Sequence, residues 1–372
     1  MIYDILPEWE SFSAYHGGAV SHMVASMMTL DPSRSIVCKH AENRWGFDAG
    51  RIQVIPSLNA YGKLRGRRHF PLRVTGPLFR QIFEPFLLKL KRGDVVWCHS
   101  QPAICASLAS IIRAKGAKLF YHSHSSLEFY AHRPHFRQFT PDAWIFISHA
   151  MHQEAMRLFP WISDTYVVHN GADERRFFPE EQSGPKQAIP LILYIGRLHE
   201  TKGVHVLVEA MRILKERNVA ARCKVVGSSF SGRTRATRYA RALVRSGPTN
   251  VQFAPFRSNA EIAHEYRRAD IVCCPSVWQE PFGNVNIEAM ACGVPVVASR
   301  VGGIPEIGAE GGVVMVEPNS AIELADALQG LVENRDLRAR VGQAGLSSFL
   351  HRFRWPIIMA QYQEIVTEKG IR

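Results

Sequence analysis

Residues 275–298, PSVWQEPFGNVNIEAMACGVPVVA, carry the pattern that decides the fold. The apolar run Ile271–Cys274 just before them predicts a buried strand, and a helix is expected from about Asn284 to Cys292. A second apolar run, Pro295–Ala298, predicts the next strand. A strand, a helix and a strand in this order form a βαβ unit, so the stretch predicts a parallel α/β sheet.

The same stretch places two carboxylates around a helix N-terminus. Gly283 would let a ligand approach the backbone closely, and the first N–H groups of the helix, from Asn284 onward, would form an anion site. Glu280 and Glu288 flank that site. Because like charges repel, we expect these carboxylates to bind hydroxyl groups of a sugar or ribose rather than phosphate. The alternative is that Glu280 caps the helix and Glu288 is a solvated helix residue.

A second motif follows another predicted strand. The segment Leu193–Leu198, LYIGRL, contains Arg197, and Lys202 comes shortly after it. Both cations would then lie at the carboxyl end of the strand. There Arg197 could bind a diphosphate through two parallel hydrogen bonds, and Lys202 could bind it as a mobile point charge. The alternative is a surface arginine paired with Glu200.

Two further motifs lie in the first half of the chain. Gly17 and Gly18 precede a predicted helix, Ala19–Leu30, and either admit a phosphate or sugar to its N-terminus or form a tight turn. They are not part of a G-x-G-x-x-G, so they do not indicate a dinucleotide site. His122 and His124 follow the start of a predicted strand and either meet a substrate hydroxyl or are structural.

Short apolar runs alternate with amphipathic segments throughout the 372 residues, which indicates two successive α/β domains. The predicted strands are 3–6, 35–38, 52–55, 94–99, 118–122, 143–147, 165–168, 191–195, 222–226, 251–253, 271–274 and 295–298. The predicted helices are 19–30, 78–90, 102–114, 149–159, 203–217, 234–245, 259–268 and 284–292. The polar stretch 171–190 lacks apolar periodicity and is interpreted as an interdomain linker. We expect the ligand to bind in the cleft between the two domains that it joins.

The formal net charge of +12 is concentrated in two segments. Residues 51–100 contain ten lysines and arginines but only two acids, and residues 222–245 contain seven arginines and lysines and no acid. A nucleic acid, an anionic membrane and a phosphorylated substrate are all compatible with such an excess. Nucleic acid is disfavoured because no recognised binding module occurs and few aromatic residues interleave with the first cluster.

The remaining bulk features favour a cytoplasmic protein. Seven cysteines without a C-x-x-C lie mostly in apolar runs, which favours reduced thiols over a disulfide or a zinc site. No run of about 18 apolar residues predicts a transmembrane helix, and the first residues lack the features of a signal peptide.

Taken in order, the motifs resemble family 4 of the retaining glycosyltransferases, which have the GT-B fold of two Rossmann-like domains. Glu280 and Glu288 with the residues between them resemble that family's E-x7-E signature. Further matches are His169-Asn170-Gly171, Gly196-Arg197, Lys202-Gly203 and Gly302-Gly303-Ile304-Pro305-Glu306. The resemblance is tight over residues 165–310 and loose over the first half.

By that resemblance the site residues acquire roles. Arg197 and Lys202 would hold the diphosphate of a nucleotide-sugar donor. The backbone of Phe282, Gly283 and Asn284 would lie against the transferred sugar and phosphate, and Gly17 and Gly18 would close on the donor from the other domain. Glu280 would bind the sugar and Glu288 the ribose, while His124, or alternatively His122, would meet the sugar near the reacting carbon.

The resemblance also implies a domain plan and a reaction. An acceptor-side domain over residues 1–170 would be completed by a C-terminal helix over 353–372, and residues 171–352 would bind the donor. We expect transfer of a hexosyl unit, from UDP by preference, to a glycan or lipid-linked acceptor, with retained anomeric configuration, in bacterial polysaccharide or glycoconjugate synthesis. No D-x-D motif occurs and the two cations would neutralise the diphosphate, so neither a metal nor another cofactor is expected.

Two alternatives concern the function and one the basic segment. A GT-B sugar-nucleotide epimerase could share the fold, and a basic nucleic-acid-binding protein could share the charge. Lys63, Arg65, Arg67 and Arg68 form either a solvated face or a patch that docks on the anionic inner leaflet of the cell membrane and brings the enzyme to its acceptor. If these residues form a membrane-docking patch, we expect a peripheral membrane protein.

Overall fold

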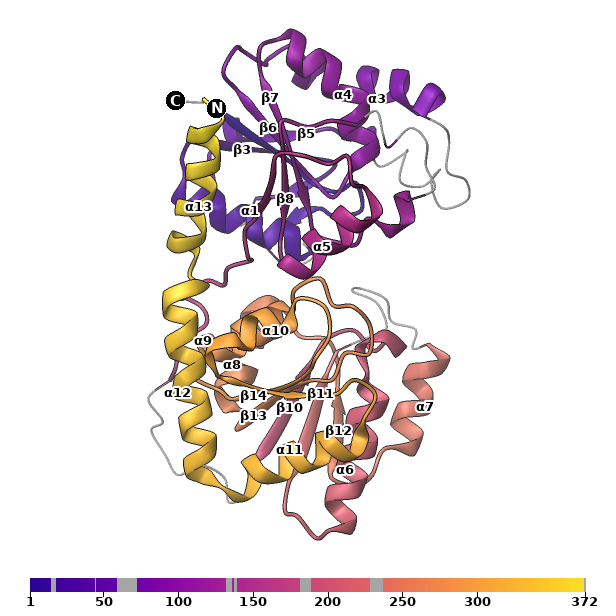
Figure 1. The fold of residues 1–372 in the computed structure, drawn as a ribbon, viewed down its shortest axis with the longest axis vertical. Coiled ribbons are helices and arrows are strands. Elements are labelled where there is room, and N and C mark those ends of the chain that lie inside the picture. Colours follow the sequence, from indigo (N-terminus) through magenta and orange to yellow (C-terminus); the bar gives the residue numbers. More distant parts are fainter. Residues whose placement is uncertain are drawn as a thin grey trace. The chain divides into compact units, whose positions relative to one another are not determined.

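The computed structural model describes residues 1–14, 18–43, 45–58, 72–131, 136, 139–180, 189–227 and 237–370. Its contacts divide the chain into two compact units, Met1–His169 with Ile358–Arg372, and Asn170–Ile357 (Figure 1). We call these the first and the second unit. The expected boundary at 170/171 lies one residue from the observed one, but the chain rejoins the first unit at Ile358 rather than at residue 353.

The first unit contains most of its elements before residue 170. These are β1 (Ile2–Ile5), β2 (Phe12–Ser13), α1 (Ala19–Leu30), β3 (Arg34–Cys38), β4 (Ala41–Glu42), β5 (Ile52–Val54), α3 (Leu72–Leu87), β6 (Val95–His99), α4 (Pro102–Ala114), β7 (Lys118–Ser123), β8 (Ala143–Phe146), α5 (His149–Leu158) and β9 (Thr165–Val167). Its sheet, within the described residues, has the order β5-β3-β1-β6-β7-β8-β9 with parallel neighbours. The order reverses between β1 and β6.

The second unit repeats this plan. Its elements are β10 (Leu191–Ile195), α6 (Val204–Glu216), β11 (Arg222–Val226), α7 (Arg238–Ser246), β12 (Val251–Ala254), α8 (Asn259–Arg268), β13 (Ile271–Cys274), α9 (Asn284–Ala291), β14 (Val296–Ser299), α10 (Ile304–Ile307), β15 (Val313–Val316), α11 (Ala321–Glu333) and α12 (Arg335–Arg352), after which α13 (Trp355–Glu368) returns to the first unit. In the described chain the parallel strands follow the order β12-β11-β10-β13-β14-β15, which reverses between β10 and β13. Both sheets thus have the doubly wound Rossmann-like order, and the predicted fold class is confirmed.

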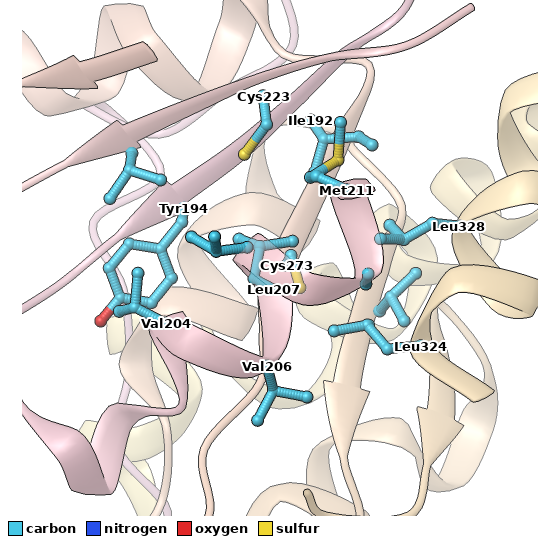
Figure 2. Close-up of a cluster of buried hydrophobic side chains, with 14 of the residues drawn as sticks. Ile192, Tyr194, Val204, Val206, Leu207, Met211, Cys223, Cys273, Leu324 and Leu328 are labelled. Carbon is cyan, nitrogen blue, oxygen red and sulfur yellow. The ribbon is translucent and has the colours of Figure 1, made fainter. Parts of the chain in front are cut away.

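The core of the second unit explains why its segments fold as they do. Ile192 and Tyr194 of β10 lie in one cluster with Cys273 of β13, because alternate residues of a strand face the same side (Figure 2). On α6, Val204, Leu207, Met211 and Leu214 recur every three or four residues and are buried against this face. Leu324 and Leu328 of α11 complete the cluster.

The expected linker is only partly a linker. Residues 171–180 pack on the second unit, where the Ala172 N–H donates to the Phe353 carbonyl at 2.9 Å. A Cβ at Gly171 would lie 2.9 Å from the Trp355 ring. Polar composition was therefore misleading here, because backbone hydrogen bonding does not require apolar periodicity. Residues 181–188 lie outside the described part.

Some helices and strands begin at other residues than predicted. The helix expected over residues 78–90 spans Leu72–Leu87 and contains Pro77 and Pro85. The helix expected from residue 234 begins at Arg238, where the Thr237 hydroxyl caps it by accepting from the Ala240 N–H. The strand Val313–Val316 was not predicted.

Cys98 and Cys105 form a disulfide, contrary to the expectation of reduced thiols. Cys98 lies in β6 and Cys105 in the first turns of α4, and the strand-to-helix turn brings their Cα atoms to 6.5 Å. The other five cysteines are free, and four of them are buried as small apolar residues. Among the described residues, no helix has both the length and the apolar character needed to cross a membrane.

Part of the positive charge has structural partners. The Arg51 guanidinium donates to the backbone carbonyls of Met28, Asp31 and Arg34. Arg80 donates to the Ser107 carbonyl, and Lys224 forms an ion pair with Glu265 at 2.6 Å. These three cations belong to the two basic clusters, so the clusters are less available to a partner than their sequence implies.

We predict that Gly203→Ala destabilises the second unit. Gly203 has φ +66°, and a Cβ there would lie 1.7 Å from the Pro275 carbonyl oxygen, so the loops after β10 and β13 would have to separate. Strain and overlap together should lower the free energy of unfolding by about 2–4 kcal/mol, measured by urea denaturation. Gly330→Ala is the matched control, because a Cβ at that position of α11 meets nothing within 4 Å. It should be neutral or stabilise by about 0.5–1 kcal/mol; equal losses for both variants would contradict the proposed close approach.

Candidate active site

The candidate site of the second unit lies where β10 and β13 end. In doubly wound sheets, ligands bind outside the carboxyl ends of the strands at the point where the strand order reverses. The two loops that leave these strands are joined by a hydrogen bond from the Val277 N–H to the Thr201 carbonyl at 2.9 Å. This contact brings Lys202 next to the residues that follow Pro275.

The Glu280 carboxylate is the most heavily engaged acid of this site. The Lys202 ammonium donates to Glu280 Oε1 at 2.8 Å and to Oε2 at 2.7 Å. Oε2 also accepts from the Ser276 hydroxyl at 3.0 Å and from the Trp278 indole N–H at 2.9 Å. The alternative that Glu280 caps the helix is wrong. Gly283 is the N-cap of α9, and no side-chain hydrogen bond caps this helix.

Ser276 and Trp278 were not identified from the sequence. They precede Glu280 by four and two residues, so in extended chain all three side chains can project to the same side. Lys202 also lies over the Trp278 ring, with Nζ 5.1 Å from its centroid. We call Lys202, Ser276, Trp278 and Glu280 the Glu280 cluster.

The glycine motif after β14 holds the loop that carries Glu280. The Gly303 N–H donates to the Glu280 carbonyl at 2.9 Å, and the Gly302 N–H donates to the Gln279 side chain at 3.0 Å. A Cβ at Gly302, where φ is +53°, would lie 2.0 Å from the Glu280 carbonyl oxygen. The motif therefore has a structural reason within the unit: only glycine admits this backbone contact.

The loop Phe282–Asn284 leads into α9 as predicted. Gly283 has φ +105°, which directs the chain into the helix that begins at Asn284. The Phe282 side chain is buried, with its ring 6.0 Å from that of Phe353, so only its backbone is available to a ligand. The Asn284 side-chain oxygen accepts from the Asn170 amide at 2.9 Å.

Glu288 lies one turn further along α9 and is not a solvated residue. Its Oε2 accepts from the hydroxyl of the fully buried Tyr266 at 2.7 Å. Burial raises the pKa of the Glu288 carboxyl, although the Tyr266 hydrogen bond and the charge of Arg176 act in the opposite direction. Glu288 is thus held in one position by a neutral donor.

Arg197 is exposed at the end of β10. Within the described residues its guanidinium forms no hydrogen bond or ion pair, so the alternative pairing with Glu200 is wrong. The Tyr194 hydroxyl donates to the Arg197 carbonyl at 2.9 Å and fixes the backbone there. Arg197 is therefore a cation held on a fixed backbone with its charge uncompensated.

In the first unit, the N-terminus of α1 has a partner within the chain. The Ser21 N–H donates to Glu10 Oε2 at 2.8 Å, and burial raises the pKa of Glu10. A Cβ at Gly18 would lie 2.3 Å from Glu10 Oε1, so Gly18 admits this carboxylate. The expected anion position is thus filled by Glu10, whereas Gly17 lies outside the described residues.

The two candidate histidines differ in exposure. His122 lies within β7 and is fully buried, with its ring near those of Trp97 and Tyr362. His124 lies one residue past the end of β7 and is half-buried. His99, at the end of β6, was not predicted, but its Nδ1 lies 3.0 Å from His124 Nε2.

Among the described residues of the first unit, these three histidines form a group that could hold a metal ion. Each offers one ring nitrogen, and the three nitrogens lie within 4.8 Å of one another. That a metal is not required remains a prediction. Lys63, Arg65, Arg67 and Arg68, the predicted membrane or acceptor patch, lie outside the described residues.

Comparison with known proteins finds a family model and several relatives that match mainly the second unit. Residues 176–347 match the model described as Glycosyl transferases group 1. D-inositol 3-phosphate glycosyltransferase of Corynebacterium jeikeium is 38% identical over 204 residues, which are 51% of this chain and 48% of that protein. Alpha-maltose-1-phosphate synthase of Mycolicibacterium smegmatis is 31% identical over 250 residues, which are 60% of this chain and 62% of that protein.

The chain spans about half to three fifths of the length of these relatives. The crystal structure of Anabaena HepE in complex with UDP-glucose superimposes with a TM-score of 0.75 at 20% identity and covers 99% of both chains. This likeness confirms the GT-B fold. The epimerase alternative finds no support in these relatives, and the match to the glycosyl transferases group 1 model covers residues 176–347.

Proposed function

We propose that the protein is a glycosyltransferase that moves a hexosyl unit from a nucleotide diphosphate sugar to a glycan or lipid-linked acceptor. The observation that carries this proposal is the Glu280 cluster at the point where the second sheet reverses its strand order. UDP is the proposed nucleotide, since the HepE structure contains UDP-glucose. The names of the two relatives describe a glycosyl transfer and a sugar phosphate synthesis.

The Glu280 cluster suits a sugar next to a diphosphate. An ammonium group has three N–H donors, and Lys202 uses two of its contacts on Glu280. The third donor remains for a phosphate oxygen, and the uncompensated Arg197 can add a bidentate contact. Ser276 and Trp278 hold Glu280 in place, so its carboxylate can accept hydrogen bonds from the sugar hydroxyls without reorganising.

In the proposed reaction, the bond between the anomeric carbon and the diphosphate oxygen breaks as the acceptor oxygen forms its bond to the same carbon. Negative charge develops on the departing diphosphate, where Arg197, Lys202 and the N-terminus of α9 stabilise it. The acceptor's proton passes to a departing phosphate oxygen. Attack from the same face retains the configuration, and the two cations serve in place of a metal.

Glu288 and His124 complete the proposed contacts. Glu288, fixed by Tyr266, binds the ribose hydroxyls, and His124 of the first unit meets a hydroxyl of the transferred sugar. We further propose that Lys63, Arg65, Arg67 and Arg68 dock the protein on the anionic inner face of the cell membrane, near a lipid-linked acceptor. Their sequence density supports this assignment.

Glu280→Gln should abolish most turnover while the fold persists. Glutamine keeps an acceptor for Ser276 and Trp278 but loses the charge that holds Lys202, so kcat for acceptor-dependent UDP release from UDP-glucose should fall about 10²-fold or more. Glu317→Gln makes the same change in an exposed ion pair with Arg300 and should leave kcat unchanged. Wild-type turnover in Glu280→Gln would remove Glu280 from the mechanism. A thermal-shift series over UDP-, GDP- and ADP-sugars identifies the donor for this assay.

Glu288→Gln should stabilise the protein and weaken nucleotide binding. Because burial raises the Glu288 pKa, its contribution to stability is present below the ordinary value near 4.5 and is lost as the pH rises through the raised native value. The glutamine variant should therefore gain about 0.5–2 kcal/mol at pH 7 and nothing at pH 4, measured by thermal unfolding. Its affinity for UDP, measured by calorimetry, should fall. Glu317→Gln again serves as the control. Identical curves of Tm against pH for wild type and Glu288→Gln would contradict the raised pKa of Glu288 in the folded protein.

The membrane assignment predicts a loss of vesicle binding. Changing Arg65, Arg67 and Arg68 together to glutamate should abolish sedimentation with vesicles rich in phosphatidylglycerol, since each cation near the surface contributes about 1 kcal/mol. Activity on a soluble acceptor should persist. The matched variant changes Arg268, Arg335 and Arg340, which are exposed in the second unit, to glutamate. Equal vesicle binding by both triple variants and the wild type would refute the patch.

A further inference from the structure

A chain of buried polar groups runs across the carboxyl end of the first sheet. Asp4 lies in β1, His99 at the end of β6 and His124 just past β7. His99 Nε2 is 3.0 Å from Asp4 Oδ1, and His99 Nδ1 is 3.0 Å from His124 Nε2. Asp4 and His99 have no exposed surface. The chain passes through the point where the strand order reverses, between β1 and β6.

Arg34 fixes the charge at the inner end of this chain. Its NH1 group lies 2.9 and 3.0 Å from the two oxygens of Asp4, and the guanidinium lies over the Trp97 ring at 4.7 Å. Burial alone would raise the Asp4 pKa, but the Arg34 charge and the hydrogen bonds from His99 and Arg34 hold it below the ordinary value. Asp4 is therefore a carboxylate, which can only accept hydrogen bonds.

The direction of each hydrogen bond follows from that carboxylate. His99 must donate to Asp4 from Nε2, and because burial lowers the His99 pKa the ring is neutral and carries one N–H. Its Nδ1 then has only a lone pair. His124 must therefore donate from Nε2 to His99 Nδ1, and since burial also lowers the His124 pKa, the Nδ1 of His124 carries the remaining lone pair.

We propose that Asp4 acts through His99 to hold His124 in the tautomer whose Nδ1 accepts a hydrogen bond, so that His124 binds a substrate hydroxyl and not an unprotonated phosphate oxygen. Asp4 and His99 are positioning residues, and this inference rests on the proposed glycosyltransferase function. Among the described residues His124 Nδ1 has no partner, and the half-buried ring leaves it accessible. A hydroxyl can donate to this nitrogen, whereas a phosphate oxygen would meet lone pair against lone pair.

The surroundings favour this relay over a metal site. The three histidine nitrogens lie close enough for a metal, but binding one would break the hydrogen bond between His99 and His124. Arg34 lies beside the cluster, and its positive charge opposes a second cation. Among the described residues, His122, whose ring centroid is 4.1 Å from that of His124, and Tyr362, whose hydroxyl is 3.5 Å from His122 Nε2, also face the relay, and neither supplies an anionic ligand.

Asp4→Asn is the decisive variant because it reverses the relay. Arg34 can only donate, so it should hold the oxygen of the introduced amide and turn the amide N–H toward His99. His99 would then accept at Nε2 and donate from Nδ1, and His124 would carry its proton on Nδ1. Nitrogen-15 NMR of histidine-labelled protein reads these tautomers directly. Asp142→Asn is the matched control, since Asp142 accepts from Lys118 and from the Leu119 N–H without touching a histidine.

The expected results are a proton on Nε2 of His124 in the wild type, its transfer to Nδ1 in Asp4→Asn, and a fall in kcat of about 10–10²-fold, the effect of losing one substrate hydrogen bond, that Asp142→Asn does not share. A wild-type His124 protonated on Nδ1 overturns the inference without any variant, as does a tautomer unchanged by Asp4→Asn or a switched tautomer with full kcat. Simultaneous shifts of all three histidines on titration with ZnCl2 would replace the relay with a metal site. If the wild type transfers no sugar, the proposed function fails, and the wild-type spectrum still decides the relay.

Discussion

The ion pair between Lys202 and Glu280 joins the loops that leave β10 and β13, and much of the second unit is arranged around those two strand ends. Gly203 lets the first loop approach the Pro275 carbonyl, and Gly302 lets the loop after β14 approach the backbone of Glu280. Because desolvation offsets much of the Coulombic gain of a largely buried pair, its contribution to net stability is small. Its consequence is instead positional: an acid and a cation are held side by side before any ligand arrives.

The first unit contains a comparable pair of a carboxylate and a cation, but the carboxylate there has a different role. Arg34 neutralises Asp4 at the reversal between β1 and β6, as Lys202 neutralises Glu280 at the reversal between β10 and β13. In the second unit the Glu280 side chain keeps 12% of its surface exposed. In the first unit the Asp4 carboxylate is fully buried, and its effect reaches the surface only through the orientation of His99 and His124. Thus the second unit holds the charge of Glu280 at its strand ends, whereas the first unit uses the charge of Asp4 to set the direction of the hydrogen bonds of His99 and His124.

Much of the second unit was predictable from the sequence. The strands Leu191–Ile195, Arg222–Val226 and Ile271–Cys274 lie where predicted, because buried parallel strands are short apolar runs bounded by polar residues. The helix from Asn284 was predicted from Gly283 and the apolar residues after it. The partners of Glu280 were not, since Ser276 and Trp278 have no motif of their own and become neighbours of Lys202 only when two loops meet.

Residue types and their spacing determined the two parallel sheets, the positions of Glu280, Glu288, Arg197 and Lys202 at strand and helix ends, and the match of residues 176–347 to a glycosyltransferase family model. Local periodicity and turn chemistry suffice for these features because they depend on residues close together in the chain. Only the tertiary structure showed that Glu10 fills the N-terminus of α1, that Arg51 and Arg80 bind backbone carbonyls, and that Asp4 reaches His124 through His99. Each of these contacts joins groups separated by 11 to 95 residues, and such pairings are decided by strand order and burial, which no local pattern encodes.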